Sequence, residues 1–308
     1  MQSSDTILVF AEPQLYFFPH YSNIVFAPYN IPQTGIRYIL YKIMELLRLP
    51  CRSIFWGSWK THIKTAKRVI IFDYGYLPRM ERYIRRINPA CQAYLFFWNR
   101  VNPYNRRHLA FSDHDAIFST DPKDCKRYGL RYNHIFYPRE FFSPHVPSEQ
   151  NRLFFLGADK GRAPYIASLK KVLEDSGLLC DIRVLVPDAD SDRRKAFKDI
   201  LTDKGLSYPE YLSQLAACNV MLDINQAGQS ALTMRVMESV YLSKKLITNN
   251  PDIISYDFYN PRNIFVLPKE GLPTADEVRD FLRLPFCPPS DHILDHYSFE
   301  HWAAQFTE

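Results

Sequence analysis

No stretch of this 308-residue chain reaches about 18 uninterrupted apolar residues, the length that a membrane-spanning helix requires. The start, MQSSDTILVFAEP, has no basic segment before its short apolar run, so we expect no signal peptide. The six cysteines are scattered, and they form no Cys-x-x-Cys pair and no cluster with histidines. These absences predict a cytoplasmic protein with reduced, mostly buried thiols and no zinc site.

Motifs of two other protein classes are also missing. The chain has no Gly-x-Ser-x-Gly sequence and no cysteine paired with a histidine, so a serine or cysteine hydrolase is unsupported. A nucleic-acid binder needs basic and aromatic residues on one exposed face. Most aromatic residues here lie instead in strand-like runs such as Tyr94–Trp98, where they are expected to pack in a core.

Positive charge is concentrated in the first half of the chain. The first 148 residues carry 20 Lys and Arg against 10 Asp and Glu, whereas the remainder carries 18 against 23. This asymmetry predicts attraction to an anionic partner, such as an acidic glycolipid at a membrane surface, and makes nucleic acid the less favoured partner. A solvated basic face is the plain alternative.

Apolar runs alternate with amphipathic segments along the whole chain, which predicts parallel sheets with helices on both faces. In the first half we expect strands and helices in turn at Thr6–Phe10, Gly35–Leu49, Arg52–Trp56, Lys60–Ala66, Val69–Phe72, Pro78–Ile87, Ala93–Trp98, Asn105–Ala110, Ala116–Ser119, Pro122–Tyr128 and His134–Tyr137. Prolines in 138–151 indicate a connection between domains. The predicted fold is α/β, with Rossmann-like domains at 1–145 and 150–285, followed by a terminal helical segment at 290–308.

The stretch Asn219–Asn250 is expected to form a strand, a polar loop, a helix and a second strand. Leu232, Val236 and Val240 have the spacing of one buried helix face. Such a βαβ unit places the loop, Asn225–Ser230, at the carboxyl edge of the sheet beside the first turn of the helix. The free N–H groups of that turn attract phosphate.

Residues suited to a nucleoside diphosphate follow in this loop and helix. Ser230 and Thr233 can donate hydroxyl hydrogens, Arg235 can bind a diphosphate, and Glu238 can accept from ribose hydroxyls. Gln229 is the remaining residue of this stretch that we expect to contact the nucleotide. An ordinary loop capped by Ser230 is the alternative interpretation.

A second strand, loop and helix begin at Arg152. The loop, Gly157–Arg162, contains two cations, Lys160 and Arg162, that can neutralise a phosphate. The alternative interpretation is a tight turn in which both cations face solvent.

The run QSALTMRVMESVYLSKKLITNN, with YDFYNPRNIFVL after it, resembles the nucleotide-sugar half of GT-B glycosyltransferases, specifically the bacterial enzymes that build lipopolysaccharide and capsular oligosaccharides. The resemblance covers residues 150–270, and the preceding half matches in general layout. Many relatives carry Glu-x7-Glu here; Glu238 takes the second place and Ser230 stands at the first. The resemblance implies a ribose contact at Glu238, a phosphate contact from the loop containing Lys160, and a nucleobase contact near Tyr208, for which packing at the helix start is the alternative. It also implies two domains facing across a cleft, with the terminal helix returning to the first.

The expected function is therefore metal-independent transfer of a sugar from a nucleotide-diphosphate sugar to a glycan or glycolipid. Peripheral contact at the inner membrane face is compatible with this function. An Asp-x-Asp sequence at Asp188 is not assigned to a metal, because it precedes a basic helix, predicted at Arg193–Leu201, that Asp192 can cap. For the acceptor hydroxyl, the candidate bases are Asp73, then His20 and Glu12, although Asp73 can also serve as a helix cap. An epimerase or hydrolase of the same shape and a non-enzymatic anion-binding protein are the alternatives.

Overall fold

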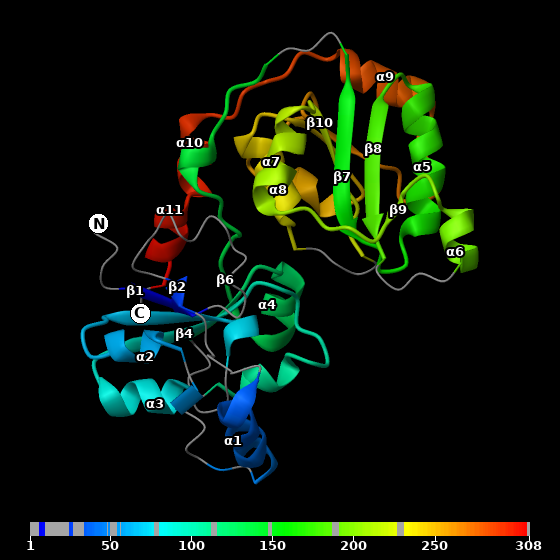
Figure 1. Cartoon of the computed structure of the whole chain (residues 1–308). Helices are drawn as coiled ribbons and strands as arrows, with labels where there is room; N and C mark the ends of the chain where they lie inside the picture. The colour runs from blue at the N-terminus through cyan, green and yellow to red at the C-terminus, as the bar shows by residue number, and fades with distance from the viewer. Residues whose placement is uncertain are drawn as a thin grey trace. The chain divides into compact units, whose positions relative to one another are not determined.

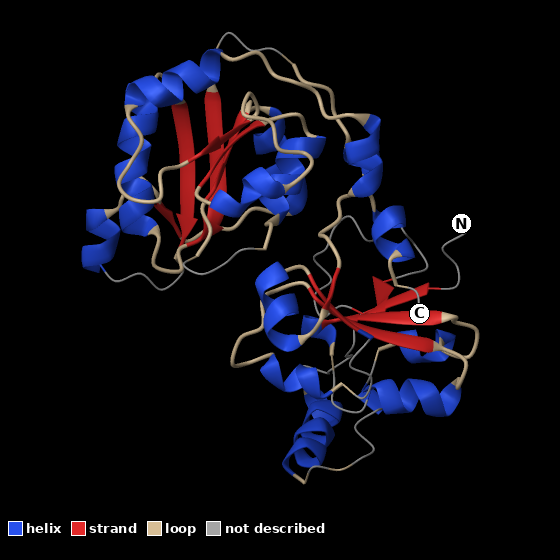
Figure 2. Cartoon of the chain, turned by 180° about the vertical axis from the view of Figure 1, so that it is seen from behind, coloured by secondary structure: helices blue, strands red, loops and turns tan. Residues whose placement is uncertain are grey.

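The computed structural model describes residues 6–9, 25–26, 34–47, 49, 54–55, 57–76, 80–111, 116–146, 150–186, 191–226 and 231–306. The chain divides into two compact units, Met1–His134 with Phe306–Glu308, and Ile135–Gln305. Each unit is built on one six-stranded sheet, and the strand pairings in both sheets are parallel (Figures 1 and 2). Within these residues, no helix combines the length and the apolar character needed to cross a membrane.

The sheet of the first unit has the strand order β2-β1-β3-β4-β5-β6. Its strands are β1 (Thr6–Val9), β2 (Val25–Phe26), β3 (Arg68–Phe72), β4 (Gln92–Phe97), β5 (Ile117–Ser119) and β6 (Arg131–Tyr132). The central strands β3 and β4 are almost continuously apolar and buried, as a parallel sheet covered on both faces requires. The direction of strand addition reverses between β1 and β3, and β3 ends immediately before Asp73.

Helices and short turns connect these strands. They are α1 (Gly35–Leu46), α2 (Trp59–His62), η4 (Asp73–Gly75), α3 (Met80–Ile87), η5 (Arg106–Ala110) and α4 (Pro122–Tyr128). The chain end also belongs to this unit, because the Phe306 ring packs 4.6 Å from the Phe118 ring and 5.5 Å from the Tyr94 ring. The preceding helix α11 (Phe299–Ala304) belongs to the second unit.

The sheet of the second unit has the order β12-β11-β10-β7-β8-β9. Its strands are β7 (Arg152–Ala158), β8 (Leu179–Leu185), β9 (Leu201–Thr202), β10 (Val220–Asp223), β11 (Lys245–Thr248) and β12 (Ile264–Val266). Counted along the chain, this is the 3-2-1-4-5-6 arrangement of dinucleotide-binding folds. The order reverses between β7 and β10, and ligands of such sheets bind at the carboxyl ends of the strands flanking that reversal.

Helices of the second unit flank its sheet on both faces, while α10 (Asp291–His296) and α11 stand apart from the sheet (Figure 1). The helices of this unit are η7 (Arg139–Phe141), α5 (Ala163–Asp175), α6 (Ser191–Ala196), α7 (Tyr208–Ala216), α8 (Met234–Tyr241), η8 (Pro251–Ser255), α9 (Ala275–Arg283), α10 and α11. Residues of α5 and α9 pack with Leu153, Phe155 and Ile182 in one buried cluster. Helices α7 and α8 lie on the other side of the sheet (Figure 1).

The α/β prediction with parallel sheets is confirmed, but three predicted elements are wrong. Ile54–Phe55 of the expected strand Arg52–Trp56 form a 3-10 turn. The segment His134–Tyr137 adds no strand, and the Tyr137 N–H instead donates to the Tyr297 carbonyl, 2.9 Å away. The helix expected at 193–201 ends at Ala196, because Leu201–Thr202 pairs with β8 as the edge strand β9. Tertiary pairing overrides local propensity there.

Candidate functional site

The candidate site lies at the carboxyl ends of β7 and β10, where the strand order of the second unit reverses. The strand β7 extends to Ala158, two residues into the predicted loop Gly157–Arg162, and residues 159–162 then lead into α5. The segment after β10 leads into α8, which begins at Met234, four residues after the end of the predicted loop Asn225–Ser230. Both loops therefore reach the edge where dinucleotide folds bind their ligands.

Asp223, the last residue of β10, organises this edge. Its carboxylate is fully buried, and its Oδ1 accepts hydrogen bonds from Thr233 Oγ1 at 2.8 Å and from Arg235 Nε at 3.2 Å. Its Oδ2 accepts from Thr248 Oγ1 at 3.2 Å. These bonds join the first turn of α8 to the ends of β10 and β11. The sequence analysis did not single out Asp223, although it is the one charged residue of an otherwise apolar strand, and such a residue signals a buried ion pair.

Three cations gather beside this carboxylate. The pKa of Lys160 is lowered by burial and by the neighbouring charges of Arg162 and Arg235. The pKa of Arg162 is lowered by burial and by Arg235. Both guanidinium groups lie over the Phe155 ring, with Arg235 5.3 Å and Arg162 5.9 Å from its centroid. The two predicted halves of a phosphate site, the β7 loop and the start of α8, are therefore next to each other.

The chain holds Arg162 and Lys160 in different ways. Arg162 donates from Nε to the Asp159 carbonyl at 3.1 Å, and its terminal nitrogens donate to the carbonyls of Ala158 and Ile224. Lys160 has a positive φ of 47°, and its ammonium forms no hydrogen bond or ion pair with any residue that the structure describes. Arg162 is thus anchored, whereas the described residues leave the donors of Lys160 available to a ligand.

Gly157, another predicted site residue, makes room for the Phe155 ring. A Cβ at this position would lie 3.0 Å from Phe155 Cζ, which is a tight contact, and 3.5 Å from Arg162 Nη2, which is an ordinary one. A larger side chain would therefore press on the ring over which both guanidinium groups lie. The glycine serves the site through this packing.

Positive charge exceeds negative charge among the described residues of this edge. Besides Asp223, the acid here is Asp159, whose Oδ1 accepts from the first N–H of α5 at 2.7 Å and whose Oδ2 pairs with Arg193. Two carboxylates thus face four cations, which are Lys160, Arg162, Arg193 and Arg235. An anionic ligand would offset the remaining charge and would also meet the amino end of α8.

Glu238 and Tyr208 lie in a packed layer of aromatic residues. Glu238 is 2% exposed, and its Oε2 accepts from Tyr211 Oη at 2.6 Å. The Tyr208 ring stacks on Tyr211 at 6.0 Å, and its hydroxyl lies 2.9 Å from that of Tyr137. Both side chains therefore already have tyrosine partners, and the ligand roles of Glu238 and Tyr208 stay predictions.

Because Glu238 is buried, we expect the difference in stability between the parent protein and a variant without this carboxyl to depend on pH. Desolvation raises its pKa from 4.5 to about 7, against the lowering effects of the Tyr211 hydrogen bond and of Arg235. Between these pH values the unfolded chain loses the proton and the folded chain keeps it, so the carboxyl destabilises the fold increasingly as pH rises. Glu238→Gln should match the parent protein at pH 4, below the unfolded pKa, and exceed its stability by about 3 kcal/mol at pH 8. Urea unfolding at both pH values measures this, and an equal difference at both would contradict it.

Asp73, the first candidate base, lies at the corresponding edge of the first unit. It is 3% exposed, and its oxygens accept from the Trp98 N–H and from Asn105 Nδ2, both at 3.1 Å. Burial raises its pKa to about 6, and these hydrogen bonds oppose the shift. The runner-up bases His20 and Glu12, and the loop residues Gln229 and Ser230, lie outside the described residues.

The Asp-x-Asp segment at Asp188 also lies outside the described residues. The predicted cap, Asp192, falls in the first turn of α6, which begins at Ser191.

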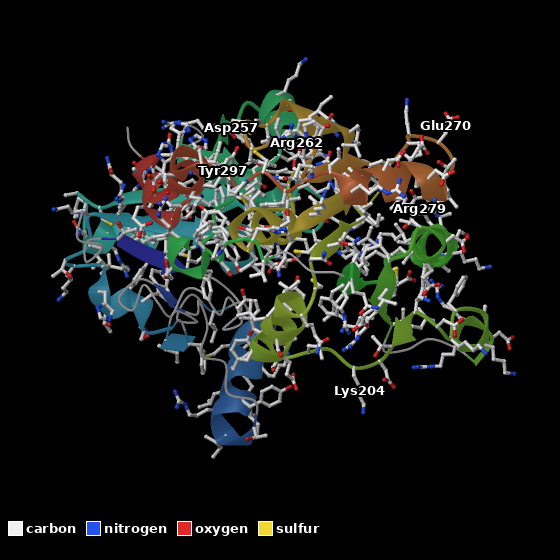
Figure 3. All side chains as sticks on the ribbon, turned by 90° about the horizontal axis from the view of Figure 1, so that it is seen from above. Lys204, Asp257, Arg262, Glu270, Arg279 and Tyr297 are labelled. Carbon is white, nitrogen blue, oxygen red and sulfur yellow. The ribbon has the colours of Figure 1, made fainter. Side chains whose placement is uncertain are left out.

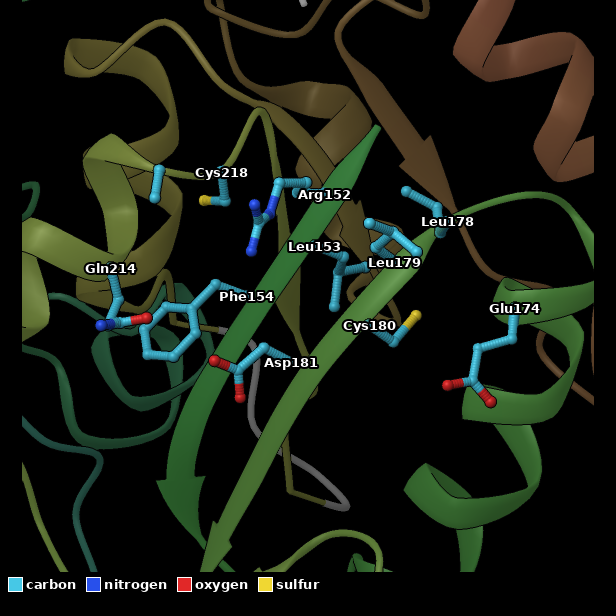
Figure 4. Close-up of a pocket in the computed structure, with 11 residues that line it drawn as sticks. Arg152, Leu153, Phe154, Glu174, Leu178, Leu179, Cys180, Asp181, Gln214 and Cys218 are labelled. Carbon is cyan, nitrogen blue, oxygen red and sulfur yellow. The ribbon is translucent and has the colours of Figure 1, made fainter. Parts of the chain in front are cut away.

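A cavity of about 500 Å³ opens at the opposite edge of the second sheet (Figure 4). It is lined by the first residues of β7 and β8, among them Arg152, Phe154 and Asp181. A smaller cavity of about 190 Å³ lies between Ser239, Lys244 and Phe286. Because ligands of parallel sheets bind at the carboxyl ends of strands, we assign the site to the cation cluster and not to these cavities. The chain matches no known protein family, and no curated protein is significantly similar to it.

Proposed function

We propose that this protein is a glycosyltransferase of the GT-B type that transfers a sugar from a nucleotide-diphosphate sugar without a metal ion. The observation that carries the proposal is the excess of positive charge from Lys160, Arg162 and Arg235 at the strand-order reversal of a dinucleotide-binding sheet. The resemblance of residues 150–270 to bacterial enzymes of lipopolysaccharide and capsule synthesis agrees with this assignment.

The chemistry requires compensation for the negative charge that develops on the leaving diphosphate. Lys160 would supply a mobile ammonium, and Arg235 would supply a guanidinium group held by Asp223. The anchored Arg162 would raise the local positive potential. Fixed cations next to a helix start need no rearrangement when the charge forms, which is the main requirement for stabilising it.

On the acceptor side, the proposal assigns Asp73 as the base that removes the hydroxyl proton. A carboxyl whose pKa is raised to about 6 by burial can accept a proton near neutral pH. The acceptor would be a glycan or glycolipid, and the 20 basic residues against 10 acidic ones in the first 148 favour an anionic acceptor at a membrane surface.

Lys160→Ala should weaken the binding of nucleoside diphosphates about tenfold, which corresponds to about 1.4 kcal/mol. Because the ammonium has no partner among the described residues, the substitution should leave the melting temperature unchanged. Lys204→Ala is the matched control, since Lys204 is an exposed lysine of the same unit and its side chain points away from the ribbon (Figure 3). Isothermal calorimetry with UDP, GDP, ADP and dTDP measures both variants.

Equal affinities of the two variants would remove Lys160 from the site. If no nucleoside diphosphate binds the parent protein, the transferase proposal fails as a whole. A protein that binds the nucleotide but releases free or epimerised sugar would instead be the related hydrolase or epimerase. One that binds it without any turnover would be a non-enzymatic binding protein.

A further inference from the structure

Asn225 is a buried side chain without a hydrogen-bond partner among the residues that the structure describes. It follows β10 by two residues and is 6% exposed, and neither Nδ2 nor Oδ1 is paired with any of these residues. More than nine in ten buried polar groups of native proteins are paired, so an amide with two unpaired atoms needs an explanation.

The backbone around Asn225 is held firmly, which rules out a loosely placed residue. Its N–H donates to Asn249 Oδ1 at 2.6 Å, and its carbonyl accepts from Asn249 Nδ2 at 3.2 Å. The preceding carbonyl, that of Ile224, accepts from Arg162. The unpaired amide is therefore presented at a defined place beside the cation cluster.

A second unpaired donor comes from the end of the neighbouring strand. Asn250 follows β11 by two residues and is 1% exposed, and its Nδ2 has no partner in the described part of the chain. Its Oδ1 accepts from the Asp252 N–H at 3.1 Å, so only the donor is available. The Asn250 N–H donates to Thr248 Oγ1, which in turn donates to Asp223. Both asparagines thus connect directly to residues that position the cations.

We propose that Asn225, with Asn250 Nδ2, binds hydroxyl groups of the sugar that the diphosphate carries. This inference rests on the proposed function. A phosphate can accept hydrogen bonds but offers no donor at neutral pH, so it would leave Asn225 Oδ1 unpaired. A hydroxyl group both donates and accepts, and it adds no charge to a site where neighbouring cations already meet the phosphates. The ligand chemistry that fits is a hydroxyl-rich group attached to a phosphate.

The test compares each nucleoside diphosphate with its glucose ester for the full chain and its variants. The selectivity is the ratio of the Kd for the free diphosphate to the Kd for the ester. Asn225→Ala should lower this ratio about tenfold while changing the Kd for the diphosphate itself less than about threefold. Its melting temperature should not fall, because the removed amide is bonded to none of the described residues.

Asn219→Ala is a control for which we expect the opposite results in stability and in selectivity. Asn219 precedes the same strand at its other end, and its amide is fully used, accepting from the Arg152 N–H and donating to Asn151 Oδ1, both at 2.8 Å. This variant should lose stability and keep the parent selectivity.

Unchanged selectivity in Asn225→Ala would overturn the inference while leaving the diphosphate site intact. A loss of stability like that of Asn219→Ala would also overturn it, since it would give Asn225 a structural role. Absence of any nucleotide binding by the parent protein would end both proposals.

Discussion

Asp223→Ala is expected to destabilise the second unit by about 3–5 kcal/mol, because it removes one member of a buried, hydrogen-bonded ion pair. The substitution leaves Arg235 without its carboxylate, beside the like charges of Arg162 and Lys160. It also deprives the hydroxyls of Thr233 and Thr248 of their acceptor. Unpaired buried groups cost more than the lost bonds themselves contribute.

Urea unfolding of the full chain measures this loss, and hydrogen exchange of the β10 and β11 amides locates it in the second sheet. Asp181→Ala is the matched control. Asp181 pairs with Arg183 at 2.7 Å on the same sheet, but its side chain is 43% exposed. Water screens such a pair, so the control should change stability by less than about 1 kcal/mol. Similar losses from both substitutions would show that Asp223 does not organise the edge.

Arg235→Ala is expected to weaken nucleoside diphosphate binding about 100-fold, which corresponds to about 2.8 kcal/mol. Arg235 combines a guanidinium group suited to a diphosphate with a position in the first turn of α8, so its loss removes both charge and hydrogen bonds from the proposed site. Arg235→Lys should recover part of the affinity, because an ammonium keeps the charge without the planar pair of donors.

Arg183 offers a close control for this experiment. It pairs with Asp181 and lies over the Phe154 ring at 5.6 Å, much as Arg235 pairs with Asp223 and lies over the Phe155 ring. Arg183→Ala should therefore leave nucleotide affinity unchanged by calorimetry. If both arginine variants bind nucleotides as the parent does, the cation cluster is not the diphosphate site.

Local patterns identified the elements on which the candidate site is built. The apolar run after Arg152, the loop ending at Arg162 and the spacing of Val236 and Val240 each lie within one short window, and the structure has a strand, a loop and a helix there. The predicted cations Lys160, Arg162 and Arg235 come together because the order of the second sheet places β7 beside β10.

Such local patterns did not predict which side chains contact each other. Glu238 meets a tyrosine 27 positions away, and the hydroxyl of Tyr208 meets one 71 positions away. Both residues therefore lie in a packed layer instead of facing an open surface. The strand β9 also depends on another segment of the chain, because Leu201 and Thr202 form it by pairing with β8.

The sequence by itself determined the α/β class, the parallel sheets, the loop that carries Lys160 and Arg162 and the helix that carries Arg235, because periodicity and turn residues act over a few neighbouring positions. The tertiary structure alone decided that Asp223 binds α8 to two strand ends, that Glu238 is enclosed, and that the Asn225 amide is unpaired among the described residues. Burial and hydrogen-bond pairing depend on segments far apart in the chain, and no local pattern specifies which of them will meet.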